Sequence, residues 1–229
     1  MPVRNAESSV CIAVESILRQ THSDLELIII DDESTDRTSL LLKKYLVDPR
    51  VLVHRNEFNL GLTKSLNLAA GLSNGQYLAR MDADDQSLPD RLNYQLSHLA
   101  KGVDLCGTRA ILSCSGKITP RISCLPSAQL LIRNIFVHGS LMFTRRLFDQ
   151  VGGYDESLSV AQDYGFLVDA ILSGAKISIA PAVQYILATN PGGITSVRFD
   201  EQVANAREIK KAYRLSIFRG RYVRRNICY

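Results

Sequence analysis

The residues with the clearest chemical potential form two acidic clusters, each directly after an apolar run. Asp31 and Asp32 end one such run, and the segment 82–85, with Asp82, Asp84 and Asp85, ends another. Carboxylates held close together repel one another, so folding alone does not favour such clusters. Mg²⁺ or Mn²⁺ would neutralise them, because these cations prefer oxygen ligands and often share them with substrate phosphates. The alternative for 82–85 is a solvated turn with an aspartate that caps the next helix.

The elements around these clusters predict an α/β fold with a mostly parallel, doubly wound, Rossmann-like sheet. Short apolar runs indicate strands, and apolar residues at helical spacing indicate helices between them. In open sheets of this kind, ligands bind at the carboxyl ends of the strands, where both clusters lie. The predicted strands are 25–30, 51–54, 77–81 and 103–107, and the predicted helices are 6–21, 37–46, 61–72 and 89–99.

The alternation of strands and helices weakens from about residue 108, where polar, Ser-rich and Pro-containing segments appear. A helix at 161–173, strands near 176–187 and an amphipathic helix at about 199–218 complete the chain. We expect one domain, 1–229, with a regular α/β half (1–107), a less regular half (108–198) and a C-terminal basic helix and tail (199–229).

The net charge of +4 is unevenly distributed over the 229 residues. Segment 207–229 carries eight of the Lys and Arg residues and a single acidic residue, on an otherwise mildly acidic chain. Such a tail would suit peripheral contact with an anionic membrane surface, and the alternative is a solvated helix end. Nucleic acid is not an expected partner, because few aromatic residues accompany the basic ones. The eight are Arg207, Lys210, Lys211, Arg214, Arg219, Arg221, Arg224 and Arg225.

The cysteines and the hydropathy pattern predict a cytoplasmic location. Five cysteines are scattered without a C-x-x-C pair, which argues against a disulfide framework or a zinc site. No apolar run approaches the roughly 20 residues of a membrane helix, and no secretory signal opens the chain.

The ordered set of motifs closely resembles family 2 of the glycosyltransferases. Each motif is modest alone, and their order and spacing from residue 2 to about 175 make the match specific. The segments that carry it are Pro2–Ala6, Ser16–Thr21, Leu25–Asp36, Asn59–Gly61, Gly75–Leu78, Asp82–Asp85, Met142–Arg146 and Gly152–Glu156.

The resemblance implies a GT-A fold and inverting transfer from a nucleoside-diphosphate sugar, with a UDP-sugar favoured, to a saccharide or lipid-linked acceptor. It makes 1–107 the nucleotide-sugar-binding half and 108–198 the acceptor-side half. Asp32 would meet the nucleobase, with Pro2 and Arg4 along the same pocket wall. Asp82 would face the ribose or donor sugar, and Asp84 would ligate Mn²⁺ or Mg²⁺ on the diphosphate. The metal would act as a Lewis acid on the leaving nucleoside diphosphate.

One lysine is a further candidate for the donor site. Lys64, after Gly61, is a candidate phosphate contact, although the first glycine of a phosphate loop is absent and a surface lysine is the alternative.

On the acceptor side, the resemblance makes Asp163 the general base that deprotonates the acceptor hydroxyl. A first-turn carboxylate matched to the helix dipole is its alternative. His138, expected on a strand, would touch acceptor or donor sugar, or be a hydrogen-bonded structural histidine. Gly153 and Tyr154 would shape the acceptor pocket as part of a tight turn.

The sequence departs from the family pattern at several places. We expect the first apolar strand to be missing before Pro2, Gln162 replaces the first acid of a Glu-Asp pair, and Asn190 stands near the place of a histidine. With no Trp and no Gln-x-x-Arg-Trp motif, a processive synthase is not expected. The alternatives are a degenerate, catalytically inactive nucleotide-sugar-binding protein and a nucleotidyltransferase, for which residues 1–20 offer no Gly-rich phosphate loop.

Overall fold

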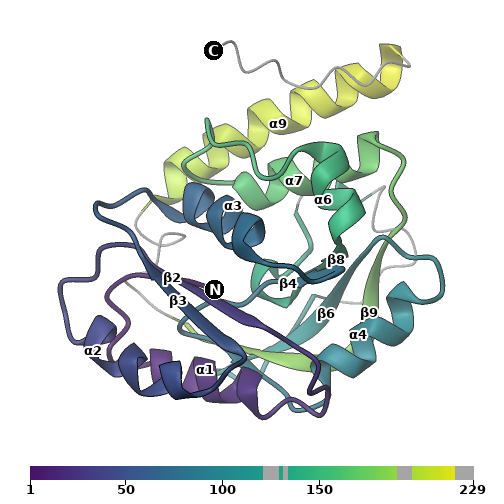
Figure 1. Ribbon diagram of the computed structural model, residues 1–229. Helices are drawn as coiled ribbons and strands as arrows, with labels where there is room; N and C mark the ends of the chain where they lie inside the picture. The colour runs from purple at the N-terminus through teal and green to yellow at the C-terminus, as the bar shows by residue number, and fades with distance from the viewer. Residues whose placement is uncertain (121–128, 131–133, 190–197, 220–229) are drawn as a thin grey trace.

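The computed structural model describes residues 1–120, 129–130, 134–189 and 198–219. Two sheets lie between two groups of helices (Figure 1). On one side are α3 (Leu62–Leu72), α6 (Arg145–Val151), α7 (Gln162–Leu172) and α9 (Phe199–Arg219), and on the other are α1 (Val10–Leu18), α2 (Thr38–Leu42) with the 3-10 helix η1 (Lys43–Val47), and α4 (Arg91–Leu99).

The first sheet is the parallel sheet that the sequence predicted. It has the order β1 (Pro2–Val3), β2 (Leu27–Asp31), β3 (Val51–Arg55), with all pairs parallel. β2 is buried on both faces: Leu27 and Ile29 pack on the α1 side, while Ile28 and Ile30 pack against Ala69 of α3. The first strand is therefore present as a two-residue strand, which corrects the expectation that it was missing.

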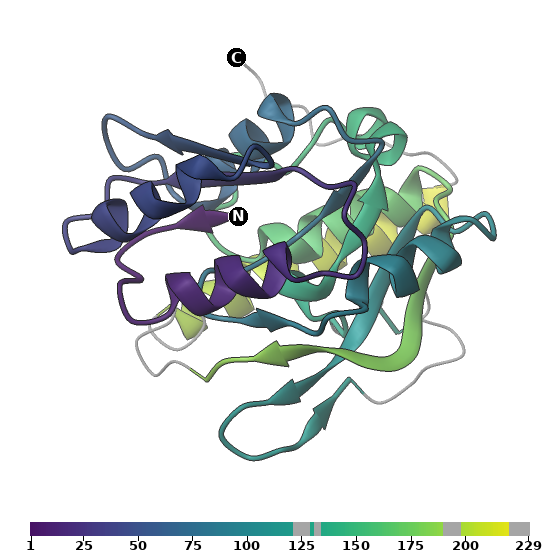
Figure 2. The ribbon, with the colours of Figure 1, turned by 60° about the horizontal axis from the view of Figure 1, so that its bottom comes forward.

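The second sheet is mixed, unlike the parallel continuation that the sequence predicted. Its order is β4 (Tyr77–Ala79), β8 (Met142–Thr144), β6 (Leu105–Leu112), β9 (Ile177–Leu187), β5 (Gln86–Ser87), and β7 (Ile118–Thr119) pairs with β6. β6 pairs parallel with β9, and the two lie side by side in Figure 2. The other pairs are antiparallel. β6 crosses the predicted boundary at residue 107.

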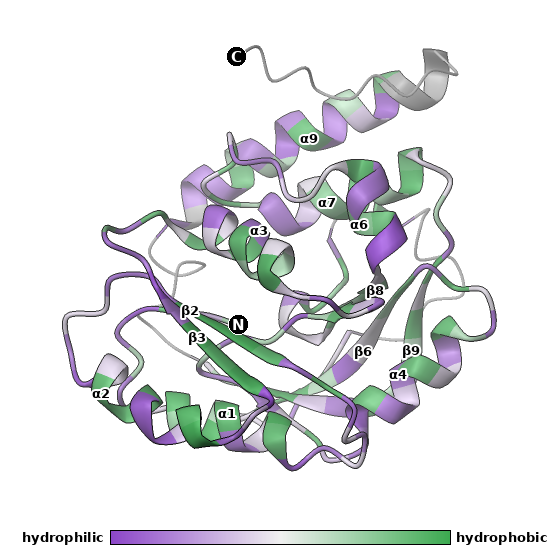
Figure 3. Ribbon diagram, in the orientation of Figure 1, coloured by the Kyte–Doolittle hydropathy of each residue, from purple (hydrophilic) through white to green (hydrophobic). Residues whose placement is uncertain are grey.

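α9 covers the predicted acceptor-side half with an apolar stripe. Ile209 and Tyr213, one helical turn apart, are buried against the core that includes α7. Polar residues occupy the other faces of α9, as the alternating colours in Figure 3 show. The predicted amphipathic helix at 199–218 is thus confirmed. No helix within the described residues is both long enough and apolar enough to cross a membrane.

Candidate active site

The aspartate loop, defined here as residues 82–85, follows β4 and is fixed at its start by a buried ion pair. The guanidinium of Arg80 donates to Oδ1 of Asp82, and the Arg80 side chain is only 2% exposed against 31% for Asp82. Burial opposes the charged form of Asp82, but the charge and hydrogen bond of Arg80, together with weaker effects of His138 and the ammonium of Met1, hold the pKa of Asp82 below its ordinary value. Asp82 is therefore ionised and paired with the guanidinium of Arg80.

Among the described residues, no cation forms an ion pair with the next two carboxyl groups of the loop. Asp84 is exposed, and partial desolvation together with the charge of Asp82 raises its pKa. Asp85 is buried: its Oδ1 accepts from the N–H of Ala188 at 2.7 Å, while Oδ2 has no hydrogen-bond partner among the described residues. Burial and the charge of Asp82 raise the pKa of Asp85 to about 7. The raised pKa values mean that both carboxyl groups would ionise more readily with a cation bound beside them.

These carboxyl groups fit a divalent cation bound together with a diphosphate. No group of three or more His, Cys, Asp and Glu side chains arranged for a metal occurs among the described residues. Mg²⁺ and Mn²⁺ do not require such a cage, since one or two carboxylates plus phosphate oxygens and water complete their coordination. Asp84, with its accessible carboxylate, and the unpartnered oxygen of Asp85 are the groups that would hold the ion.

Buried side chains beneath the loop hold its shape. Arg91 is fully buried, donates to the carbonyl of Arg80 at 2.7 Å and lies over the ring of Tyr185 at 5.0 Å. The hydroxyl of Tyr185 accepts from the N–H of Asp82 at 3.3 Å. Gly139 allows this approach, because a Cβ there would lie 2.2 Å from the Tyr185 hydroxyl and 2.9 Å from Oδ2 of Asp82.

His138 and Tyr154 form the next layer of the site. The Nε2 of His138 lies 3.1 Å from the Tyr154 hydroxyl, and the two rings meet edge to face. Burial and the nearby Arg80 lower the pKa of His138 to about 3, so its imidazole is neutral. His138 lies in the 3-10 helix η2 (His138–Ser140), so its expected place on a strand was wrong. Because Gly139 has no side chain, this short helix passes close to the aspartate loop.

Gly153 and Tyr154 are held by α3 in a tight turn, as the sequence predicted. Gly153 has a φ of +77°, which favours glycine, and a Cβ there would lie 2.8 Å from Oδ1 of Asn67. Asn67 accepts from the N–H of Tyr154 at 2.9 Å and donates to its carbonyl at 3.0 Å. These bonds fix the backbone from which the Tyr154 ring extends.

Asp163 lies in the first turn of α7, and its carboxylate has one strong partner. Oδ2 accepts from the side-chain amide of Asn134 at 2.6 Å. Burial raises the pKa of Asp163, which makes it a stronger base when it is ionised. Burial raises the pKa of the Tyr154 hydroxyl, and the charges of Asp163 and Asp82 add to that rise.

The carboxylates of the first acidic cluster, Asp31 and Asp32, accept hydrogen bonds from neighbouring backbone and side-chain groups. Asp32 is buried and accepts from Asn56 at 2.8 Å, from the N–H of Leu60 at 2.8 Å and from the N–H of Gly61 at 2.9 Å. Asp31 accepts from the N–H of Ser34 at 3.0 Å and from the hydroxyl of Ser39. This cluster shapes the loops after β2 and β3.

The remaining predicted residues form no hydrogen bond or ion pair with the aspartate loop among the described residues. Pro2 is buried in β1, whereas Arg4 and Lys64 are exposed. Within the described residues, no hydrogen bond or ion pair joins either cation to residues 82–85. Asn190 lies outside the described residues, so its predicted departure stays a prediction.

Sequence reasoning missed Arg80, Arg91, Tyr185, Gly139 and Asn134. Arg80 did carry a signal: a charged residue inside an otherwise apolar strand needs a buried partner. Gly139, Asn134 and Tyr185 are brought to the site by segments far away in the chain, and no local pattern marks them. Arg91 is close in sequence, at the start of α4, but no local pattern showed that its side chain is buried.

The arrangement of the elements places this protein among glycosyltransferases of the GT-A fold. The structure of S. aureus TarS 1-349 in complex with UDP-GlcNAc matches with a TM-score of 0.75 at 20% identity, over 91% of this chain and 64% of that one. The mannosyltransferase PcManGT from Pyrobaculum calidifontis, in complex with GDP-Man and Mn²⁺, matches with a TM-score of 0.73 at 18% identity, over 93% of this chain and 62% of that one. At such identities these matches show the fold.

The chain belongs to glycosyl transferase family 2, whose family model matches residues 1–152. The putative glycosyltransferase EpsE of Bacillus subtilis is 31% identical over 67% of this chain and 58% of its own length. The putative colanic acid biosynthesis glycosyl transferase WcaA of Escherichia coli is 30% identical over 84% of this chain and 72% of its own. The chain thus spans little more than half of the EpsE protein.

Proposed function

We propose that the protein transfers a sugar, with inversion, from a nucleoside-diphosphate sugar to a saccharide or lipid-linked acceptor in cell-surface polysaccharide synthesis. The observation that carries the proposal is the aspartate loop, with its raised carboxyl pKa values and the unpartnered oxygen of Asp85, together with the buried carboxyl of Asp163, whose charge acts on the same Tyr154 hydroxyl as that of Asp82. The carboxylates of the aspartate loop suit a metal-bound diphosphate, and the carboxylate of Asp163 suits an acceptor hydroxyl. A UDP-sugar is the favoured donor, as in the TarS complexes.

The residues divide the reaction between them. Asp84 holds Mn²⁺ or Mg²⁺, and the metal supplies Lewis acidity to the leaving diphosphate when bound. Asp82, kept ionised and oriented by Arg80, faces the ribose or the donor sugar. Asp163, oriented by Asn134, takes the proton of the acceptor hydroxyl as that hydroxyl attacks the anomeric carbon. Pro2, Arg4 and Asp32 line the nucleobase side, with Lys64 near the phosphates.

α9 supports a location at the inner face of the membrane. Ile209 and Tyr213 face the core, while Arg207 and Lys211 are exposed on the same helix. Exposed cations of this kind are attracted to anionic lipid head groups. The basic residues beyond Arg219 lie outside the described residues.

Titration calorimetry with UDP and GDP, with and without Mn²⁺, tests the donor site, and release of UDP from UDP-glucose and UDP-N-acetylglucosamine tests turnover. We expect Mn²⁺-dependent UDP binding in the wild type and in Asp163→Asn, with turnover lost only in Asp163→Asn. UDP binding without turnover in the wild type would instead identify a nucleotide-sugar-binding protein. No binding by the folded protein would refute the proposal.

A further inference from the structure

Ala161, the residue immediately before α7, has a left-handed backbone conformation that its side chain disfavours. Its φ is +59°, a value that glycine adopts freely and that is unfavourable for a residue with a Cβ. Such a conformation persists only where the surrounding structure enforces it, and residues of this kind cluster at functional sites. Asp163, the proposed base, is the second residue of α7. The direction in which α7 begins therefore decides where the carboxylate of Asp163 lies.

Hydrogen bonds hold the peptide groups on both sides of Ala161. The carbonyl of Ala161 accepts from the N–H of Gly165 at 3.1 Å, which closes the first turn of α7. The carbonyl of Val160 accepts from the side-chain amide of Asn205, on α9, at 3.3 Å. These two carbonyls belong to the rigid peptide planes that flank Ala161, so the two bonds together fix its φ and ψ.

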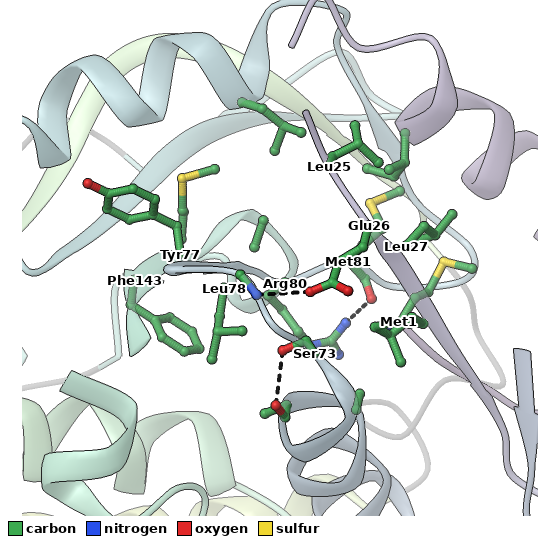
Figure 4. Close-up of a pocket in the computed structure, with 18 of the residues that line it drawn as sticks. Met1, Leu25, Glu26, Leu27, Ser73, Tyr77, Leu78, Arg80, Met81 and Phe143 are labelled. Atoms are coloured by element: carbon green, nitrogen blue, oxygen red, sulfur yellow. Dashed lines mark hydrogen bonds between the residues drawn. The ribbon is translucent and has the colours of Figure 1, made fainter. Parts of the chain in front are cut away.

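The chain on either side of this turn is anchored by other contacts. In α7, the ring of Phe166 packs on that of Phe143 in β8 with ring centroids 4.8 Å apart (Phe143 is drawn in Figure 4). Before the turn, the carbonyl of Leu158 accepts from the hydroxyl of Thr63, on α3, at 2.8 Å. Residues 159–161 lie between these two anchors, and α9 is the helix whose side chains bond to them.

α9 bonds to this short stretch at two points, and only one of them is shielded from water. The hydroxyl of Ser159 donates to Glu201 at 2.9 Å and accepts from Arg198 at 3.1 Å, and both bonds are exposed. Val160, by contrast, is buried, and the bond from Asn205 to its carbonyl is partly buried. A hydrogen bond with less competition from water holds its partner more firmly. Asn205 is therefore the contact on which the conformation of Ala161 depends most.

We propose that Asn205 is a positioning residue for Asp163. By holding the carbonyl of Val160, it keeps Ala161 in the left-handed conformation and so directs the first turn of α7 toward the site. The inference rests on the proposed role of Asp163 as the base. It gives α9 a part in the reaction in addition to its packing against the core.

Asn205→Ala removes the amide and introduces a residue of high helix propensity, so α9 should stay folded, as circular dichroism can establish. We expect kcat for UDP release to fall about tenfold, while KM for the UDP-sugar changes less than about twofold, because the donor half keeps its contacts. Asn205→Asp, of the same size but without the N–H donor, should act alike. Gln202→Ala is the matched control: it removes an amide of α9 that makes no hydrogen bond among the described residues, and it should not lower kcat.

Ala161→Gly separates a positioning role from a purely structural one. Added to Asn205→Ala, it should raise kcat at least about threefold, because glycine keeps the left-handed conformation without the bond. In the wild type, where Asn205 already holds this conformation, it should not raise kcat. Full turnover in Asn205→Ala, or the same effect of Ala161→Gly in both backgrounds, would overturn the role of Asn205 and leave the proposed function intact. A folded wild type without turnover would refute the proposed function and this role with it.

Discussion

The acidic clusters after β2 and after β4 are alike in sequence and different in structure. The carboxylates of Asp31 and Asp32 accept hydrogen bonds from loop N–H groups and side chains, which bind the loops around them. In the aspartate loop, Asp84 is exposed and Asp85 retains a buried oxygen with no partner among the described residues. The charge of the first cluster holds the loops in place, whereas the charge of the second stays available for a ligand.

Asp84 gives the strongest test of the difference between the two clusters. Asp84→Asn should lower kcat/KM about a hundredfold to a thousandfold, because it removes the accessible ligand for the metal. The free energy of unfolding should stay unchanged or rise slightly, since the substitution relieves repulsion from Asp82. UDP-release kinetics and urea unfolding measure the two effects. A loss of stability as large as the loss of activity would contradict a ligand role, and Asp24→Asn, at an exposed position, is the control.

Gly139 tests whether the shape of the aspartate loop depends on close packing. Gly139→Ala should destabilise the protein by about 3 kcal/mol, because its Cβ would overlap the fully buried Tyr185. Thermal unfolding measures this. Gly71→Ala is the control: nothing lies within 4 Å of its added Cβ, and the helical site should gain up to about 1 kcal/mol. Equal stability of the two variants would show that the loop adapts.

Asp32 tests the architectural role of the first cluster. Asp32→Asn should lower the free energy of unfolding by about 2 kcal/mol, because the new amide would face the N–H donors of Gly61 or Asn56. Unlike Asp84→Asn, it should weaken UDP binding with and without Mn²⁺ alike. Urea unfolding and calorimetry measure both properties. A stable variant that lost only the Mn²⁺-dependent part of binding would reverse the roles of the two clusters.

Local pattern was sufficient to predict the first sheet. The apolar run 25–30 indicated a strand buried on both faces, and β2 packs against helices on each side. Apolar spacing also located α1, where the predicted residues Val10, Ala13, Val14 and Ile17 are buried. These features depend on residues close together in the chain, which is why periodicity reveals them.

Pairing between distant segments could not be predicted in the same way. β4 was expected in a parallel sheet, but it pairs antiparallel with β8, a three-residue strand too short to show a pattern. Likewise, His138 was placed on a strand, whereas η2 turns the chain there. Tyr185, which was missed, reaches the aspartate loop through such a long-range contact.

The smallest expected effect concerns the charge balance beside the aspartate loop. Burial and Arg80 lower the pKa of His138 from 6.5 to about 3, so between these values the unfolded chain binds a proton that the folded protein does not. The stability contributed by neutral His138 is present above pH 6.5 and is lost as the pH falls from 6.5 toward 3. By pH 5.5 the loss should be about 1.4 kcal/mol.

His138→Gln removes this titration while its amide can still bond to the Tyr154 hydroxyl. The variant should therefore lose less stability than the wild type between pH 7 and pH 5.5, in urea unfolding at each pH. Parallel curves for the two proteins would mean that His138 takes up its proton in the folded state as readily as in the unfolded chain. Arg80 would then not be the only cation beside Asp82, and the charge that the second cluster keeps for a ligand would be smaller than its carboxylates indicate.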